Sequence, residues 1–171
     1  MNIKSLLFTL VSVFMIGVAV QAQAAISLED YTAKNEGWEV NIDKAYEMSQ
    51  KTGRPILANF TGSDWCGWCI RLDKSVFHTD AFKAWAKDNV ILLELDFPRR
   101  KQLPVEIRRQ NANLQKAFSI TGYPTIWVFD LSKDEEGRYA IAALGKTGYA
   151  KTSKEFTDAC DRMIAQRKKA E

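Results

Sequence analysis

Two cysteines separated by two residues, Cys66 and Cys69, closely follow a short apolar run at residues 55–60. A run of this length before the turn residues 61–64 predicts a strand that is buried on both faces. The cysteines would then begin a helix at the end of that strand. The first cysteine would lie beside free helix N–H groups and the positive end of the helix dipole, which favour a thiolate over a thiol. Because a thiolate is the species that attacks disulfides, the pair predicts a redox centre.

Metal and haem binding are the other chemistries that a cysteine pair can support. A structural zinc site needs four ligands, and beyond the pair the chain offers only Cys160 and His78, at no recognisable spacing. Haem attachment is excluded because Ile70, and not histidine, follows the second cysteine. A carrier of a soft metal such as Cu(I), bound by two thiolates, is the alternative that stays open. We expect no metal or other cofactor.

The N-terminal segment predicts export. Lys4 precedes an uncharged stretch at 6–20, and an Ala-x-Ala arrangement precedes a cut after Ala24. The stretch has 15 residues, whereas a membrane-spanning helix needs about 20. We therefore expect a cleavable signal peptide at 1–24, a periplasmic or secreted protein, and no membrane span after cleavage. The three cysteines do not form the disulfide framework of a small exported domain, which uses an even number.

The remaining chain predicts one α/β domain at 42–168 after an N-terminal arm at 25–41. Helical periodicity, capping residues and short apolar runs predict helices at 43–50, 79–87 and 152–167, and strands at 55–60, 90–97, 124–130 and 138–144. Residues 98–109 look like an insertion or long solvated loop, because basic residues dominate there. Asn111 or Asn113 is expected to cap a further helix ending at Ser119. The formal net charge of +3 argues for no particular partner, and we expect no nucleic acid.

This order of elements, with two short motifs, resembles the thioredoxin family. The motifs are Asp64-Trp65-Cys66-Gly67-Trp68-Cys69 and Gly122-Tyr123-Pro124-Thr125. Exported bacterial thioredoxin-like proteins have a motif similar to the first, and the resemblance covers roughly 42–167. It implies a thioredoxin fold, in which helices flank a central mixed β-sheet, and it implies thiol–disulfide exchange. It also implies a cis peptide bond before Pro124, in a loop that faces the reactive cysteine.

The position of the two cysteines on the helix assigns their roles. Cys66 would attack a substrate disulfide, and Cys69, one turn further along, would resolve the mixed disulfide. The expected substrate-contacting residues are Trp65, Trp68, Tyr123 and Pro124. The substrates would be protein or small-molecule disulfides, and a donor or acceptor protein would exchange electrons with the pair. Reduction is favoured by the resemblance, with isomerisation or oxidation as the alternative.

The chain departs from the family pattern at the position of a buried acid. Many thioredoxins have this acid on the strand before the cysteines, where this chain has Asn59. Glu94 on the next strand is a possible substitute, although we expect an exposed carboxylate at the strand end. The Gly-Trp dipeptide between the cysteines leaves the redox potential open. Cys160 is expected to be a buried apolar residue, and His78 a solvated or capping residue.

Overall fold

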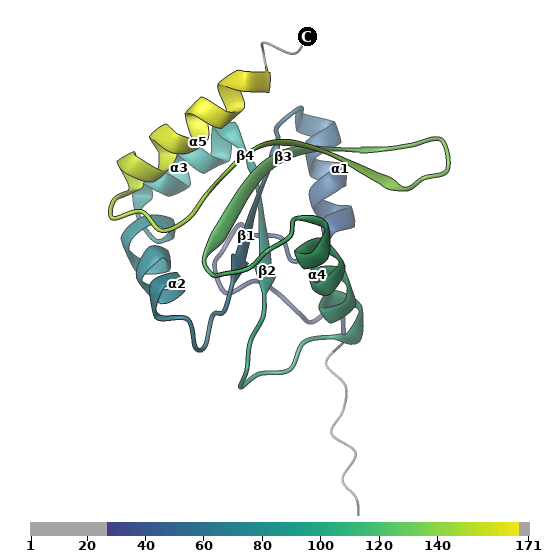
Figure 1. Ribbon diagram of the computed structural model, residues 1–171, viewed down its shortest axis with the longest axis horizontal. Coiled ribbons are helices and arrows are strands. Elements are labelled where there is room, and N and C mark those ends of the chain that lie inside the picture. Colours follow the sequence, from purple (N-terminus) through teal and green to yellow (C-terminus); the bar gives the residue numbers. More distant parts are fainter. Residues whose placement is uncertain (1–26, 168–171) are drawn as a thin grey trace, which may run out of the picture.

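The computed structural model describes residues 27–167, so the predicted signal peptide at 1–24 lies outside the described residues. The sheet has four strands in the order β2-β1-β3-β4 (Figure 1). The strands are β1 (Ile56–Thr61), β2 (Ile91–Asp96), β3 (Thr125–Lys133) and β4 (Tyr139–Thr147). β1 and β2 are parallel, whereas β3 is antiparallel to both of its neighbours, β1 and β4. The expected mixed sheet of the thioredoxin fold is confirmed.

Helices cover both faces of this sheet (Figure 1). They are α1 (Ile42–Thr52), α2 (Gly67–Leu72), α3 (Asp80–Asn89), α4 (Val105–Ala117) and α5 (Ser153–Arg167), and a π-helical turn, η1 (Asp73–Phe77), continues α2. One core layer joins the sheet to α2, α3 and α5, and the other joins it to α1 and α4. Side chains alternate between these layers along β1, since Leu57 lies in the first layer and Ala58 in the second. Among residues 27–167, no helix is both long and apolar enough to span a membrane.

The capping residues in the sequence set most of the helix ends. Gly53 ends α1 with a positive φ of 69°, a conformation that glycine adopts without steric cost. Thr79 caps α3 by accepting a hydrogen bond from the backbone N–H of Phe82. The Thr152 hydroxyl accepts one from the N–H of Glu155 at the start of α5 (3.2 Å). The helices expected at 43–50, 79–87 and 152–167 are thereby confirmed.

The start of α4 differs from the expectation. A long loop over 98–109 and a cap at Asn111 or Asn113 are both wrong, because α4 begins directly after Pro104 and only 98–104 form the loop. Pro104 is the N-cap, with an extended ψ of 144°, and its backbone oxygen accepts a helical hydrogen bond from the N–H of Arg108 (2.9 Å). Asn111 is buried in the second turn of the helix, and its amide donates a hydrogen bond to the backbone oxygen of Asp96 (2.9 Å). The asparagine ties α4 to the end of β2.

The segment before α1 covers the outer edge of the sheet. Glu39 forms a parallel bridge with Leu93 of the edge strand β2. The Trp38 side chain is buried, and its ring centroid lies 5.0 Å from that of Phe77 and 6.3 Å from that of Phe82. The last residues of the predicted arm therefore pack on the domain and bury groups of β2 that an open edge strand would expose.

Candidate active site

The cysteine pair lies at the carboxyl end of β1, after a tight turn. Cys66 is the N-cap of α2, and its backbone N–H donates to the oxygen of Gly62 (2.9 Å). A disulfide joins the two cysteines, whose Cα atoms are 5.2 Å apart. The sulfur of Cys66 accepts a hydrogen bond from the backbone N–H of Cys69 (3.2 Å). In this oxidised form both cysteines are buried, with exposed fractions of 6% for Cys66 and 4% for Cys69.

Trp65 fixes the shape of the turn. Its indole N–H donates to the backbone oxygen of Phe97 (2.8 Å), and the ring lies so close to Gly62 that a Cβ there would come within 2.5 Å of it. Trp68 has a different setting, since it is 53% exposed and its ring centroid lies 4.9 Å from that of Tyr149. Of these two tryptophans, both expected to contact the substrate, Trp65 supports the turn and Trp68 presents an apolar surface beside the cysteines.

The second motif lies at the same end of the sheet. The Tyr123–Pro124 peptide bond is cis, as the resemblance implied. Thr125, the first residue of β3, pairs with Phe60 near the end of β1, which brings the loop before it to the turn that leads to the cysteines. The Tyr123 ring packs edge-on against Trp65 with a centroid distance of 5.7 Å. The fold thus assembles the two motifs, 64–69 and 122–125, into one site.

Glu94 is buried beside this site, so the expectation of an exposed carboxylate is wrong. It is 4% exposed and is the register partner of Asn59 on β1. Strand alternation places both side chains on the α2 side of the sheet. The segment before α1 causes the burial, since the backbone N–H of Lys34 donates to the Glu94 carboxylate (3.3 Å). The segment before α1 thus covers a strand end that was expected to be exposed.

The surroundings of Glu94 hold a proton near neutral pH. Burial raises its pKa to about 7, and the nearby Asp96 carboxylate adds to the rise, whereas the Lys34 N–H and the Lys101 ammonium oppose it. A cavity of about 10 Å³ is bordered by both Glu94 and Cys69. This volume is near the lower limit for one water molecule. The buried carboxyl group therefore shares a small polar space with the second cysteine of the pair.

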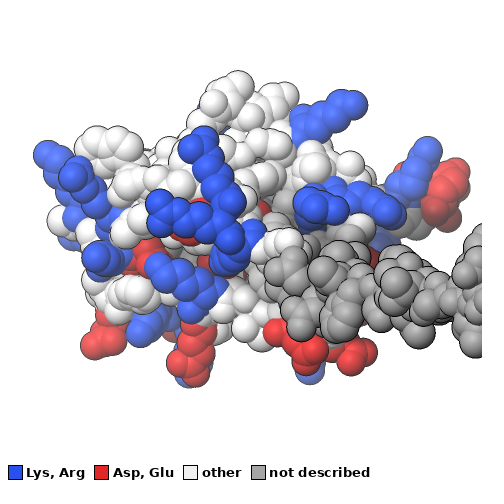
Figure 2. Space-filling view, turned by 90° about the horizontal axis from the view of Figure 1, so that it is seen from below, with Lys and Arg blue, Asp and Glu red and all other residues white. Residues whose placement is uncertain are grey.

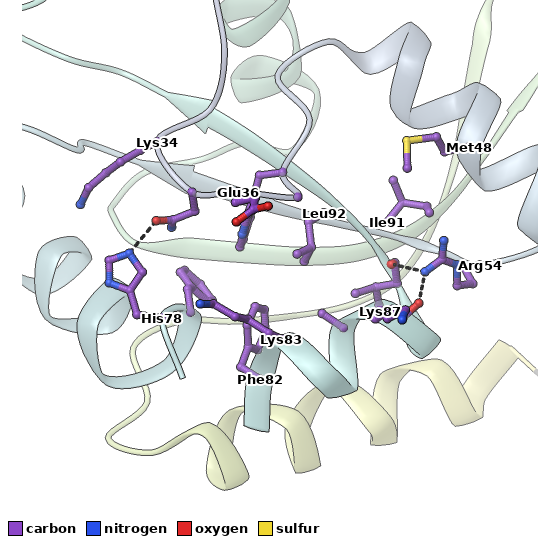
Figure 3. Close-up of a pocket in the computed structure, with 16 residues that line it drawn as sticks. Lys34, Glu36, Met48, Arg54, His78, Phe82, Lys83, Lys87, Ile91 and Leu92 are labelled. Carbon is purple, nitrogen blue, oxygen red and sulfur yellow. Dashed lines mark hydrogen bonds between the residues drawn. The ribbon is translucent and has the colours of Figure 1, made fainter. Parts of the chain in front are cut away.

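A larger cavity lies elsewhere, between the N-terminal segment, β2 and α3 (Figure 3). Its volume is about 420 Å³, and neither Cys66 nor Cys69 borders it. His78 is exposed there and ends η1 as a capping residue, with its Nε2 atom 2.8 Å from Oδ1 of Asn35 (Figure 3). Arg54 donates to the backbone oxygen of Val90 (3.3 Å). Polar groups of this cavity thus bind one another, and the cavity is separate from the cysteine site.

Cys160 is fully buried in the α5 layer of the core, as expected, and burial raises the pKa of its thiol to about 12. This thiol stays protonated at neutral pH. Among residues 27–167, no group of three or more His, Cys, Asp or Glu side chains is arranged to hold a metal ion.

A thioredoxin fold with a Cys-x-x-Cys pair at the end of β1 defines a thiol–disulfide oxidoreductase. Comparison with known proteins agrees with this class. The model of a thioredoxin-like family matches residues 37–130, and the chain belongs to this family.

Individual relatives are similar over most of the domain. The chain is 32% identical over 117 residues to the disulfide bond reductase DsbH of Chlamydia pneumoniae, covering 68% of this chain and 70% of that protein. It is 28% identical over 108 residues to the thioredoxin-related protein DsbJ of the same organism, covering 63% of this chain and 30% of that protein.

Solved structures show the same fold. A DsbH oxidoreductase superposes with a TM-score of 0.62 at 28% identity, covering 82% of this chain and 94% of that one. A thioredoxin from Thermus thermophilus reaches a TM-score of 0.51 at 14% identity, covering 75% of this chain and 84% of that one. This second likeness is one of fold alone.

Proposed function

We propose that the protein reduces disulfides of other proteins outside the cytoplasm, with Cys66 as the nucleophile and Cys69 as the resolving thiol. One observation carries the assignment of the nucleophile. The sulfur of Cys66 accepts the Cys69 N–H at the start of the helix, so this sulfur is the one at which a free helix N–H stabilises negative charge. The similarity to a disulfide bond reductase supports the reductive direction.

Reduction takes two exchange steps. The Cys66 thiolate attacks a substrate sulfur, which forms a mixed disulfide and releases the first substrate thiolate. Cys69 then loses its proton and attacks the Cys66 sulfur, which releases the second substrate thiol and leaves the Cys66–Cys69 disulfide. The substrate gains two electrons and the cysteine pair loses two. A separate thiol donor must reduce the pair before the next turnover.

The residues around the pair supply the remaining functions. Glu94 borders the same cavity as Cys69, so its carboxylate is the group that accepts the proton of the resolving thiol. Trp68, Tyr123 and Pro124 would contact the substrate, and Trp65 would hold the turn. The proposed location rests on the signal peptide expected at 1–24. Isomerisation or oxidation by the same pair is the alternative direction.

The redox potential of the Cys66–Cys69 pair tests the direction. It is measured by equilibrating the protein in glutathione or dithiothreitol buffers of known potential and quantifying the free thiols. A value near that of thioredoxin, about −270 mV, is expected for a reductase. A value near that of a strong oxidant, about −120 mV, would instead assign the protein to disulfide formation. The metal content of the reduced, purified protein is measured by mass spectrometry. Bound copper would indicate the Cu(I) carrier, whereas neither a reductase nor an oxidant needs it.

A further inference from the structure

The end of the molecule that carries the cysteines is basic. Figure 2 views this end, at which the turn before α2 and the loop 98–104 lie, and Lys and Arg side chains gather across it. The formal net charge of the whole chain is only +3, so the local excess of cations is a property of this end. Basic residues commonly extend into solvent without a function. A functional role therefore requires contacts that hold these side chains at the site.

Two of the arginines are fixed on the tryptophans of the cysteine motif. The guanidinium carbon of Arg99 lies 3.9 Å from the ring centroid of Trp65, and that of Arg71 lies 4.9 Å from the centroid of Trp68. Such stacking is favourable and holds a charged group over an aromatic face. Since Trp65 precedes Cys66 directly and Trp68 follows it by two residues, both cations are held on rings that flank the reactive cysteine in the chain.

The loop that carries Arg99 and Arg100 is also fixed to the turn. The Asp64 carboxylate accepts hydrogen bonds from the backbone N–H groups of Arg99 (3.0 Å) and Arg100 (2.7 Å). These bonds, that of Arg99 foremost, lower the pKa of Asp64, so its charge is committed to the backbone of the loop. The loop is therefore anchored at Asp64, the first residue of the cysteine motif.

The charges of these arginines are not compensated. Within the described part of the chain, Arg71, Arg99 and Arg100 form no ion pair, whereas Lys101 pairs with Asp96 (2.7 Å). All three arginines are exposed and are thus available to a bound substrate.

We propose that Arg71, Arg99 and Arg100, here called the basic rim, select disulfides that are flanked by acidic groups. The inference rests on the proposed exchange at Cys66. Cations held at the cysteine motif attract carboxylates of the substrate and raise its rate of encounter. The exposed ring of Trp68 adds an apolar contact. The predicted substrate is an exposed disulfide in a protein segment rich in Asp or Glu.

The test compares three small disulfides that differ in charge. They are dithiodipropionate, a dianion; bis(2-hydroxyethyl) disulfide, which is neutral; and cystamine, a dication. Each is mixed with the reduced protein, and the second-order rate constant of oxidation is followed by tryptophan fluorescence. The variant is Arg99→Glu/Arg100→Glu. The control, Lys51→Glu/Arg162→Glu, makes the same change of charge on α1 and α5, two helices that do not carry the cysteine motif or the loop 98–104 (Figure 1).

The ratio of variant to wild-type rates cancels the intrinsic reactivity of each disulfide. With the dianion, the variant should react about 10-fold more slowly than the wild type. With the neutral disulfide the two rates should agree within about 2-fold, and with the dication the variant should react faster. These differences should shrink at 0.5 M salt, because salt screens exposed charges. The control should leave all three ratios near one.

The single variant Arg100→Glu keeps the Arg99–Trp65 stack. It should rank the three disulfides in the same order as the double variant does, with smaller changes in rate. Equal changes for all three disulfides, or the same order in the control, would overturn the proposal. Failure of the proposed function would look different, because wild-type protein would then not react with the neutral disulfide either.

Discussion

At the scale of single residues, the buried carboxyl group of Glu94 is the least expected feature of the site. Many thioredoxins have the acid on the strand before the cysteines, whereas here Asn59 occupies that position on β1 and Glu94 lies next to it on β2. The Asn59 side-chain oxygen is buried, and within the described residues it has no hydrogen-bond partner. An amide cannot accept a proton as a base. Two carboxyl groups border the cavity beside Cys69, and since Asp73 is paired with Lys34 (2.6 Å), we propose that Glu94 accepts the Cys69 proton.

Replacing Glu94 with Gln should slow the second exchange step more than the first. The carboxylate accepts the Cys69 proton, whereas the attack by Cys66 does not involve it. In the wild type, the second step should accelerate as pH rises through about 7, where Glu94 loses its proton, and the variant should lose this dependence. Rapid quenching followed by mass spectrometry measures both steps. A variant in which the mixed disulfide decays at the wild-type rate would exclude this role.

The same carboxyl group should make stability depend on pH. Its folded pKa of about 7 lies above the unfolded value of about 4.5, so the native state binds the extra proton between these values. Stability therefore falls as pH rises from about 4.5 to 7, by about 3 kcal/mol at most. Glu94→Gln should remove this loss and gain stability over the wild type toward pH 8. Urea unfolding of the oxidised proteins at several pH values measures it; a difference that is constant with pH would contradict the assignment.

At the scale of elements, the structure shows which boundaries a sequence can reveal. Ends set by local chemistry were predictable, because Gly53 and Thr79 act through backbone groups within a few residues. The start of α4 was not, since Asn111 looks like a cap and instead donates to β2 across the core. The burial of Glu94 also depends on a contact between distant residues and so could not be predicted, because the segment that covers it lies 60 residues earlier in the chain.

The turn between β1 and α2 offers a matched pair of glycine substitutions. Gly62→Ala would place a methyl group 2.5 Å from the Trp65 ring, whereas at Gly67 nothing lies within 4 Å. We expect Gly62→Ala to cost about 1–3 kcal/mol of stability, because Trp65 must move from its bond to Phe97. Gly67→Ala should change stability by less than about 1 kcal/mol, since alanine favours the helix. Thermal unfolding of both variants decides it, and equal losses would argue against a turn shaped by Trp65.

At the scale of the whole molecule, the two-layer core separates reactive from inert sulfur. Cys66 and Cys69 lie at the end of the sheet, whereas Cys160 lies on the buried face of α5, within a core layer. The α/β architecture was predicted from the order of elements, and the assembly of the two motifs was implied by the resemblance to thioredoxins. The location of the basic rim was not predicted, because its arginines come from α2 and from a loop about 30 residues further along.

Thiol labelling should separate these environments. After reduction of the native protein, iodoacetamide should modify Cys66 first and leave Cys160 unmodified, because burial keeps that thiol protonated and out of contact with the reagent. All three cysteines should react in denaturant. Peptide mapping by mass spectrometry assigns the sites. Labelling of Cys160 in the native protein at the rate of Cys66 would show that the α5 layer opens readily.

The most direct measurement of the central claim is the covalent intermediate itself. The reduced Cys69→Ser protein is mixed with a peptide that contains one disulfide, and the intact mass and the modified residue are determined. The account predicts one peptide joined to Cys66, persisting because no resolving thiol is present, and no adduct in Cys66→Ser/Cys69→Ser. A peptide joined to Cys69 in the Cys66→Ser protein, with none joined to Cys66 in Cys69→Ser, would reverse the two roles and contradict the account.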